Sequence, residues 1–241
     1  MRCPPPTSRR RSERNRSSSC PWEPWRRTDR TFPNHSVPKK TDCSSIPLVI
    51  DVAGMALIVS PGGHGVRAYE AETGREQWCA RYESWSVVPR PVFADGVLIV
   101  CGGSARPTMY GIRPEIATGE VTNTPALLWK GSRNVPTMPS PVLTGKRLYT
   151  MTATTLSCLD PATGKEFWSG NIPGQHLASP VAGEGRLYLF NTTGGGAVAA
   201  LGDTFRILAT NRLDNGCYAS PAIVGKALLV RTTSHLYRIE E

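Results

Sequence analysis

The chain repeats one short pattern five times, and this repeat restricts its fold more than any other feature. Each copy has a proline, two or three apolar residues, a glycine-containing turn and a second apolar run, and the copies start near Pro47, Pro91, Pro141, Pro180 and Pro221. Units of roughly 40–45 residues with short apolar runs have the size of one four-stranded propeller blade. No stretch shows the 3.6-residue apolar period of an amphipathic helix over three turns. We therefore predict an all-β fold, a partial β-propeller of about four to five antiparallel blades.

A second motif lies inside the repeat and joins an acidic residue, a Thr-Gly turn and a tryptophan. It runs from Ala68 to Trp78 and again from Cys158 to Trp168, and a stretched copy runs from Gly111 to Trp129. An aspartate in such a turn accepts hydrogen bonds from backbone N–H groups, and the glycine adopts a positive φ that closes the hairpin. We expect the indole on the outer strand to lie over that glycine, because no Cβ obstructs the ring. The residues predicted to dock in this way are Ala68, Gly74, Trp78, Gly119, Trp129, Asp160, Gly164 and Trp168.

These motifs resemble the PQQ-like (pyrroloquinoline quinone type) propeller repeat, whose blades are locked by tryptophan docking motifs. The resemblance covers about residues 46–241. It extends to uncharacterised bacterial envelope propellers through the stretch Ile112-Arg113-Pro114 and the final segment from His235 to Glu240. Two departures are a segment from Thr204 to Leu208 without the expected tryptophan and a last unit that stops after its third strand. The resemblance implies a longer parent of seven or eight blades, and a location in the periplasm or at the cell surface.

The first 45 residues differ in composition from the rest and are predicted to form a basic, disordered tail. Nine arginines and two lysines face three acidic residues within residues 1–40, whereas the remaining chain is nearly neutral despite the overall net charge of +9. Because no basic face accompanies the tail, we expect no specific nucleic-acid partner. The tail lacks the apolar stretch of a signal peptide, and no apolar run is long enough for a transmembrane helix. The abrupt change near residues 41–46 suggests a misassigned start or an altered reading frame.

The sequence offers no recognisable catalytic, cofactor-binding or metal-binding set. Quinoprotein dehydrogenases with this repeat hold PQQ above a calcium ion, and many stack a vicinal disulfide on the cofactor. Here no two cysteines are adjacent, the acidic residues are spread along the chain, and the four histidines lack metal-ligand spacing. We expect Cys79, Cys101, Cys158 and Cys217 to act as small buried hydrophobic residues, with one disulfide between neighbouring strands left open.

The function predicted from these observations is a noncatalytic propeller that binds or scaffolds protein or saccharide partners. Arg90 and Arg113, each followed by proline, are candidates for the rim of a binding mouth, or else for solvated charges. An incomplete ring also exposes sheet edges, so association through them is expected. The alternative is a fragment of a PQQ-dependent quinoprotein dehydrogenase, and only this alternative predicts PQQ and Ca²⁺ as cofactors.

Overall fold

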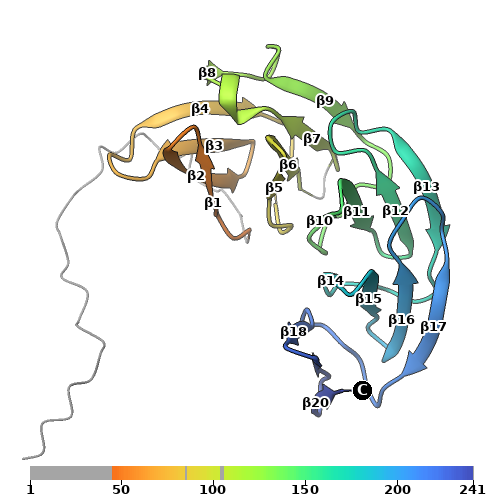
Figure 1. Ribbon diagram of the computed structural model, residues 1–241. Coiled ribbons are helices and arrows are strands. Elements are labelled where there is room, and N and C mark those ends of the chain that lie inside the picture. Colours follow the sequence, from red (N-terminus) through yellow and green to blue (C-terminus); the bar gives the residue numbers. More distant parts are fainter. Residues whose placement is uncertain (1–44, 85, 104–105, 241) are drawn as a thin grey trace, which may run out of the picture. The chain divides into compact units, whose positions relative to one another are not determined.

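The computed structural model describes residues 45–84, 86–103 and 106–240 (Figure 1). These residues form five sheets in chain order, together with one 3₁₀ turn, η1 (Pro114–Ile116). The predictions of an all-β fold and of propeller blades are confirmed. No described helix has the length and apolar character needed to cross a membrane. The predicted tail lies outside the described residues except for Ser45.

Four of the sheets have at least four strands, and we name the five sheets blades 1 to 5. Blade 1 contains β1 (Leu48–Val52), β2 (Met55–Gly62), β3 (Gly65–Glu70) and β4 (Glu76–Arg81), with β8 (Gly119–Glu120) added at its edge. Blade 2 contains β5 (Val92–Ala94), β6 (Val97–Cys101), β7 (Met109–Ile112) and β9 (Leu127–Gly131). Blade 3 contains β10 (Val142–Thr144), β11 (Arg147–Met151), β12 (Thr155–Leu159) and β13 (Glu166–Asn171). Blade 4 contains β14 (Val181–Gly183), β15 (Arg186–Phe190), β16 (Gly195–Ala200) and β17 (Ile207–Arg212). Blade 5 contains β18 (Ala222–Val224), β19 (Ala227–Arg231) and β20 (Leu236–Ile239).

The repeated proline stands immediately before the first strand of every blade. A proline costs least there, because a strand entrance does not need its missing N–H. In blades 1 to 4 the first and second strands are then joined by two-residue turns in which both residues have positive φ, as in Asp95-Gly96 and Glu184-Gly185. Such turns match the twist of the flanking antiparallel strands.

The hydrophobic core lies between the sheets. Each of its four clusters of buried residues draws on two consecutive blades, and the largest, between blades 1 and 2, contains Trp78, Val59 and Leu98. Figure 1 shows the blades side by side in a curved row, with the first strands on the inner side and the fourth strands on the outer side. The first strands of blades 2 to 5 contact one another in sequence. Every blade is therefore stabilised through its neighbours, as in other repeat proteins.

Large apolar side chains remain exposed on blades 1, 4 and 5. Leu236 is 70% exposed, Ile46 and Val49 are exposed to a similar degree, and Leu208 on β17 is 43% exposed. The outer strand β17 has five exposed residues out of six. Association through these open sheet edges stays a prediction.

Candidate functional site

The tryptophans of blades 2 and 3 lie against the following blade. Trp129 donates its indole N–H to the carbonyl of Pro161 at 2.8 Å, and Trp168 donates to the carbonyl of Gly202 at 2.9 Å. A Cβ at Gly164 would stand 2.6 Å from the Trp129 ring. The sequence motif had suggested the glycine of the same turn. The Trp129 ring instead lies between Gly111 of its own blade, where a Cβ would also collide with the indole, and Gly164 of the next blade. The reason is that side chains stand perpendicular to a sheet and meet the neighbouring sheet.

The turns themselves have the chemistry that the motif predicts. Gly74 and Gly164 have φ of 71° and 69°. The carboxylate of Asp160 accepts backbone hydrogen bonds from Ala162 at 2.7 Å and from Thr163 at 3.2 Å. A β-bulge follows the residue opposite each tryptophan, next to Ala68 in blade 1, Gly111 in blade 2 and Cys158 in blade 3. The bulge bends the outer strand next to the residue whose indole side chain projects from it.

Phe205 supplies the aromatic contact of blade 4. Its ring centroid lies 5.5 Å from that of Trp168, and a Cβ at Gly170 would collide with the Phe205 ring. The position on β17 that corresponds to Trp78 holds Ala209, since Ala209 pairs with Val198 just before the bulge. The segment without a tryptophan therefore receives the ring of blade 3 but offers no ring to blade 5.

The joint between blades 1 and 2 is built differently. Trp78 is fully buried, and its indole N–H has no hydrogen-bond partner among the described residues. The connection between β7 and β9 is long, and it contains η1 and β8. Strand β8 pairs in parallel with β4, with Trp78 opposite Gly119 and Cys79 opposite Glu120. Gly119 therefore lies along the outer strand of blade 1 instead of closing a turn of blade 2.

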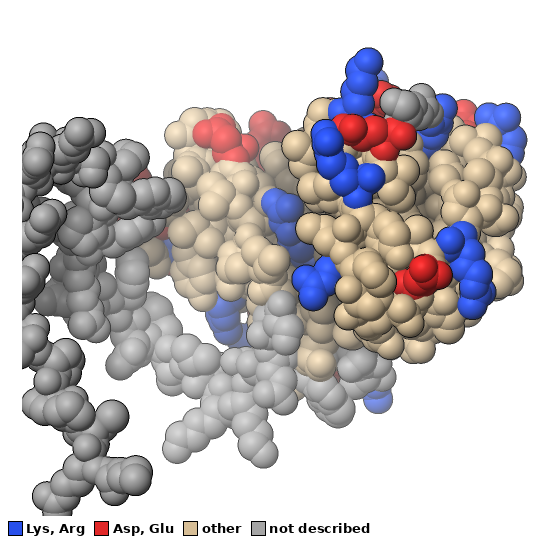
Figure 2. Space-filling view, turned by 90° about the horizontal axis from the view of Figure 1, so that it is seen from below, with Lys and Arg blue, Asp and Glu red and all other residues tan. Residues whose placement is uncertain are grey.

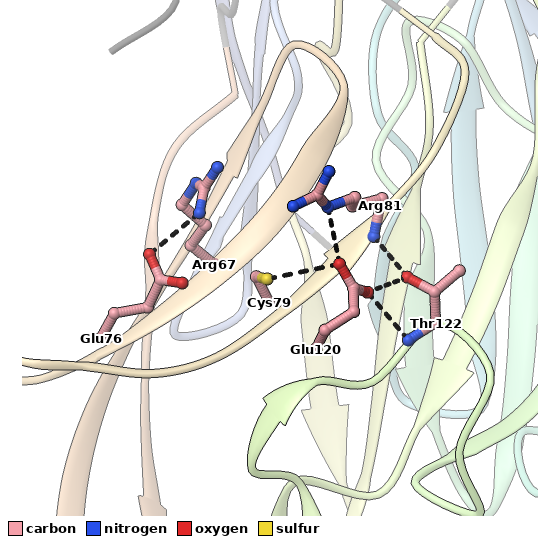
Figure 3. A network of polar contacts seen from close by, with 6 residues as sticks. All are labelled: Arg67, Glu76, Cys79, Arg81, Glu120 and Thr122. Carbon is pink, nitrogen blue, oxygen red and sulfur yellow. Dashed lines mark hydrogen bonds and ion pairs between the residues drawn. The ribbon is translucent and has the colours of Figure 1, made fainter. Parts of the chain in front are cut away.

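A polar network surrounds this added strand (Figure 3). Glu120 forms an ion pair with Arg81 at 2.7 Å, and it also accepts hydrogen bonds from the backbone and hydroxyl of Thr122. The Cys79 thiol lies 3.7 Å from the same carboxylate. Burial alone would raise the pKa of Glu120, but Thr122 and Arg81 together lower the pKa of this carboxyl below its ordinary value. Burial, and next the Glu120 charge, raise the pKa of Cys79.

A ladder of serine hydroxyls joins the entrances of the first strands. The N–H groups of Arg90, Ser140 and Ser179 each donate to the serine hydroxyl of the next blade, at 2.9, 2.8 and 3.0 Å. The acceptors are Ser140, Ser179 and Ser220. Sequence reasoning missed this ladder, although the repeated Ser-Pro dipeptide carries its signal.

The two rim arginines do not meet. Arg90 precedes β5, and Arg113 follows β7. The strand register places Cys101 opposite Met109 and Leu98 opposite Ile112. Arg90 therefore stands at the end of blade 2 where β7 begins, and Arg113 at the opposite end. Both arginines are exposed. Because they stand at opposite ends of blade 2, they cannot line one common mouth.

An open pocket of about 380 Å³ lies between blades 3 and 4. Arg147 donates two hydrogen bonds to the Asp203 carboxylate across the joint, at 2.9 and 2.6 Å, and its guanidinium lies 4.3 Å from the Phe167 ring centroid. The Tyr149 hydroxyl accepts the Gly202 N–H at 2.9 Å. The pocket is lined by Thr144, Gly145, Lys146, Arg147, Tyr149, Leu201, Gly202 and Asp203.

Nowhere in residues 45–84, 86–103 and 106–240 do three acidic, histidine or cysteine side chains come together as a metal site requires. The four cysteines of the blades are free thiols, so the alternative of a disulfide between them is wrong. Burial raises the pKa of Cys101 to about 12 and that of Cys158 to about 11. Such thiols stay protonated and behave as small apolar groups.

The surface charges are mixed. On the face shown in Figure 2, basic and acidic side chains are interspersed over a mostly uncharged surface. Most ion pairs, such as Arg67 with Glu76 at 2.9 Å, lie on the exposed surface. Surface pairs of this kind contribute little to stability.

Comparison with known proteins agrees with this architecture. A family model described as outer membrane protein assembly factor BamB matches residues 25–176, 117–204 and 153–240. The solved structure of BamB from Moraxella catarrhalis is similar, with a TM-score of 0.58 at 18% identity over 80% of this chain and 59% of that chain. The computationally designed Ika8 protein has a TM-score of 0.62 at 12% identity, over 80% of this chain and 56% of that chain. No curated protein sequence matches.

The chain therefore spans less than two thirds of the length of each of these two structures. At such identities the structural likeness shows the fold, a β-propeller. The family matches together extend from residue 25 to residue 240. The chain thus belongs to the PQQ-like propeller repeat family described as outer membrane protein assembly factor BamB.

Proposed function

We propose that this chain is a noncatalytic binding module that holds a protein partner on the ends of neighbouring blades in the bacterial cell envelope. The observation that carries the proposal is the pocket between blades 3 and 4, where the Arg147–Asp203 pair joins exposed turns of two blades. The docked indoles and the serine ladder fix these turns relative to each other. A rigid scaffold with exposed loops is a common basis for binding. The name of the family model, an assembly factor, supports a protein as the partner.

Charge reversal beside the pocket tests this proposal. Lys146 occupies the Gly145-Lys146 turn, and Lys226 follows glycine in the corresponding Gly225-Lys226 turn of blade 5. Lys146→Glu should abolish recovery of a partner from envelope extracts by the tagged full-length protein, whereas Lys226→Glu should leave recovery unchanged. Recovery of no partner by the unmodified protein would count against a binding role. A recovered ligand that resists protease and contains carbohydrate would instead identify a saccharide.

We also propose that the protein acts without PQQ or Ca²⁺. The scattered acidic groups described above support this, because a calcium site needs several oxygen ligands at once. Adding PQQ and Ca²⁺ to the full-length protein should change neither its melting temperature nor its absorbance, and no substrate should reduce a dye. A rise in melting temperature together with dye reduction would establish the quinoprotein alternative.

A further inference from the structure

The outer edge of blade 1 already binds an extended segment, namely β8. The carbonyl of Cys79 accepts the Val121 N–H at 2.8 Å, and the N–H of Arg81 donates to the Thr122 hydroxyl at 2.8 Å. The Arg81 side chain binds the Glu120 carboxylate (Figure 3). An outward-facing backbone and one arginine thus recognise the sequence Gly119-Glu-Val-Thr122.

The outer strand of blade 4 repeats the register of β4. Gly65 pairs with Arg81 in blade 1, and Gly195 pairs with Arg212 in blade 4, in each case three residues from the pair beside the bulge. Arg212 therefore occupies the position of Arg81, and Thr210 that of Cys79. Among the outer strands, arginine stands here only in β4 and β17, since β13 has Asn171 and the chain after β9 continues with Ser132.

The edge of β17 is open, whereas that of β4 is filled. Residues 208–212 are all exposed, and the ion pairs among the described residues do not include Arg212. Ala209 replaces the indole of Trp78, so the flank of the strand is not covered by a ring. By the shared register, the carbonyl of Thr210 and the N–H of Arg212 point away from β16.

We propose that the β17 edge binds an extended, acidic segment of a partner protein, parallel to the strand and of the type Gly-Glu-x-Thr. The glycine would lie opposite Ala209, the glutamate would pair with Arg212, and the hydroxyl would accept the Arg212 N–H. The segment would add a fifth strand to blade 4, as β8 does to blade 1, and strand addition is a general mode of peptide recognition. This inference rests on the proposed binding function and names a second contact surface for it.

A peptide with the sequence of residues 117–124, Ala-Thr-Gly-Glu-Val-Thr-Asn-Thr, is the probe. Titrated into the ¹⁵N-labelled full-length chain, it should shift the amide signals of residues 207–212. Arg212→Ala should weaken binding about tenfold, as expected for loss of a charged hydrogen bond. Arg206→Ala is the matched control and should bind normally, because Arg206 is exposed and precedes the strand. A peptide with glutamine in place of its glutamate should bind the unmodified protein about as weakly as the original peptide binds the Arg212→Ala variant.

Thr210→Pro provides an independent test. It removes an N–H that points to the open edge and leaves the hydrogen bonds to β16 intact, so the blade should fold and the peptide should no longer bind. Equal binding to the Arg212→Ala and unmodified proteins, or shifts confined to blade 1, would overturn the proposal. If the signals of residues 207–212 shift with protein concentration in the absence of peptide, the edge binds a second copy of this chain and the proposed partner segment is wrong. The two proposals can fail separately. If Lys146→Glu abolishes partner recovery but the peptide does not bind the unmodified protein, the proposed binding function stands and only the β17 edge site is refuted.

Discussion

At the scale of single residues, the fold depends on bare backbone surfaces that receive aromatic rings. Gly164 receives Trp129 and Gly170 receives Phe205, while Trp78 is enclosed by the connection that contains β8. The three joints differ in detail: two indole N–H groups find carbonyl partners in the next blade, and that of Trp78 does not. The rings therefore contribute mainly through burial.

Replacing Trp78 by alanine should lower the free energy of unfolding by about 3–5 kcal/mol, because a fully buried indole leaves a large cavity. Trp168→Ala should cost less, since Trp168 is only partly buried. Urea denaturation followed by circular dichroism measures both values. A loss below about 1 kcal/mol for Trp78→Ala would contradict the docking role.

His176 should make stability depend on pH. Burial lowers the pKa of this histidine below its ordinary value of 6.5, so the unfolded chain binds more protons than the folded chain below about that pH. The contribution of neutral His176 to the free energy of unfolding should therefore be fully present above pH 6.5. It should be lost as the pH falls through the folded-state pKa. Denaturation at pH 7.5 and 5.5 checks this, and the control is His176→Val. Valine is chosen because the buried residue Val87 stands four positions before the repeated Pro91, as His176 stands four positions before Pro180. An equal decrease in the control variant would exclude His176 as the cause.

At the scale of strands and turns, the serine ladder links one blade entrance to the next. Ser140→Ala removes the acceptor for the Arg90 N–H and should cost about 1 kcal/mol of unfolding free energy. Ser169→Ala is the matched control, because its hydroxyl binds only Glu166 on the exposed surface, and it should change stability by less than about 0.5 kcal/mol. Equal losses in equilibrium denaturation would show that the ladder contributes nothing specific.

The strands and turns could be predicted from local sequence because proline, glycine and the apolar runs act locally. Gly74 and Asp160 serve the turns that their spacing indicates. The contact of Trp129 with Gly164 of the next blade could not be predicted, since spacing along the chain does not reveal which neighbouring sheet an indole faces. Strand β8 was missed for a related reason. Gly119 and Glu120 pair with residues about 40 positions earlier, and a two-residue strand has no periodicity to detect.

At the scale of the whole molecule, the blades form a chain of nearest-neighbour contacts. The cluster between blades 4 and 5 has only three buried residues, Phe190, Cys217 and Val230, whereas that between blades 1 and 2 has sixteen. In repeat proteins such differences set the order in which units open.

Hydrogen exchange should therefore be fastest in β18, β19 and β20 and slowest in β2, β3 and β6. Mass spectrometry of the native full-length protein after timed labelling would measure this gradient. Equal protection of blade 5 and blade 2 would contradict the view that each blade is stabilised by its contacts with its neighbours, and it would indicate that all blades unfold as one cooperative unit.

The parallel pairing of β8 with β4 has a mechanical consequence. Strand β8 belongs to blade 2 along the chain but to blade 1 through its hydrogen bonds, so it acts as a clasp between the two. When the described segment is pulled from both ends, blade 5 should peel away at low force. Blades 1 and 2 should rupture last and together, because separating them requires shearing the clasp and its Arg81–Glu120 ion pair.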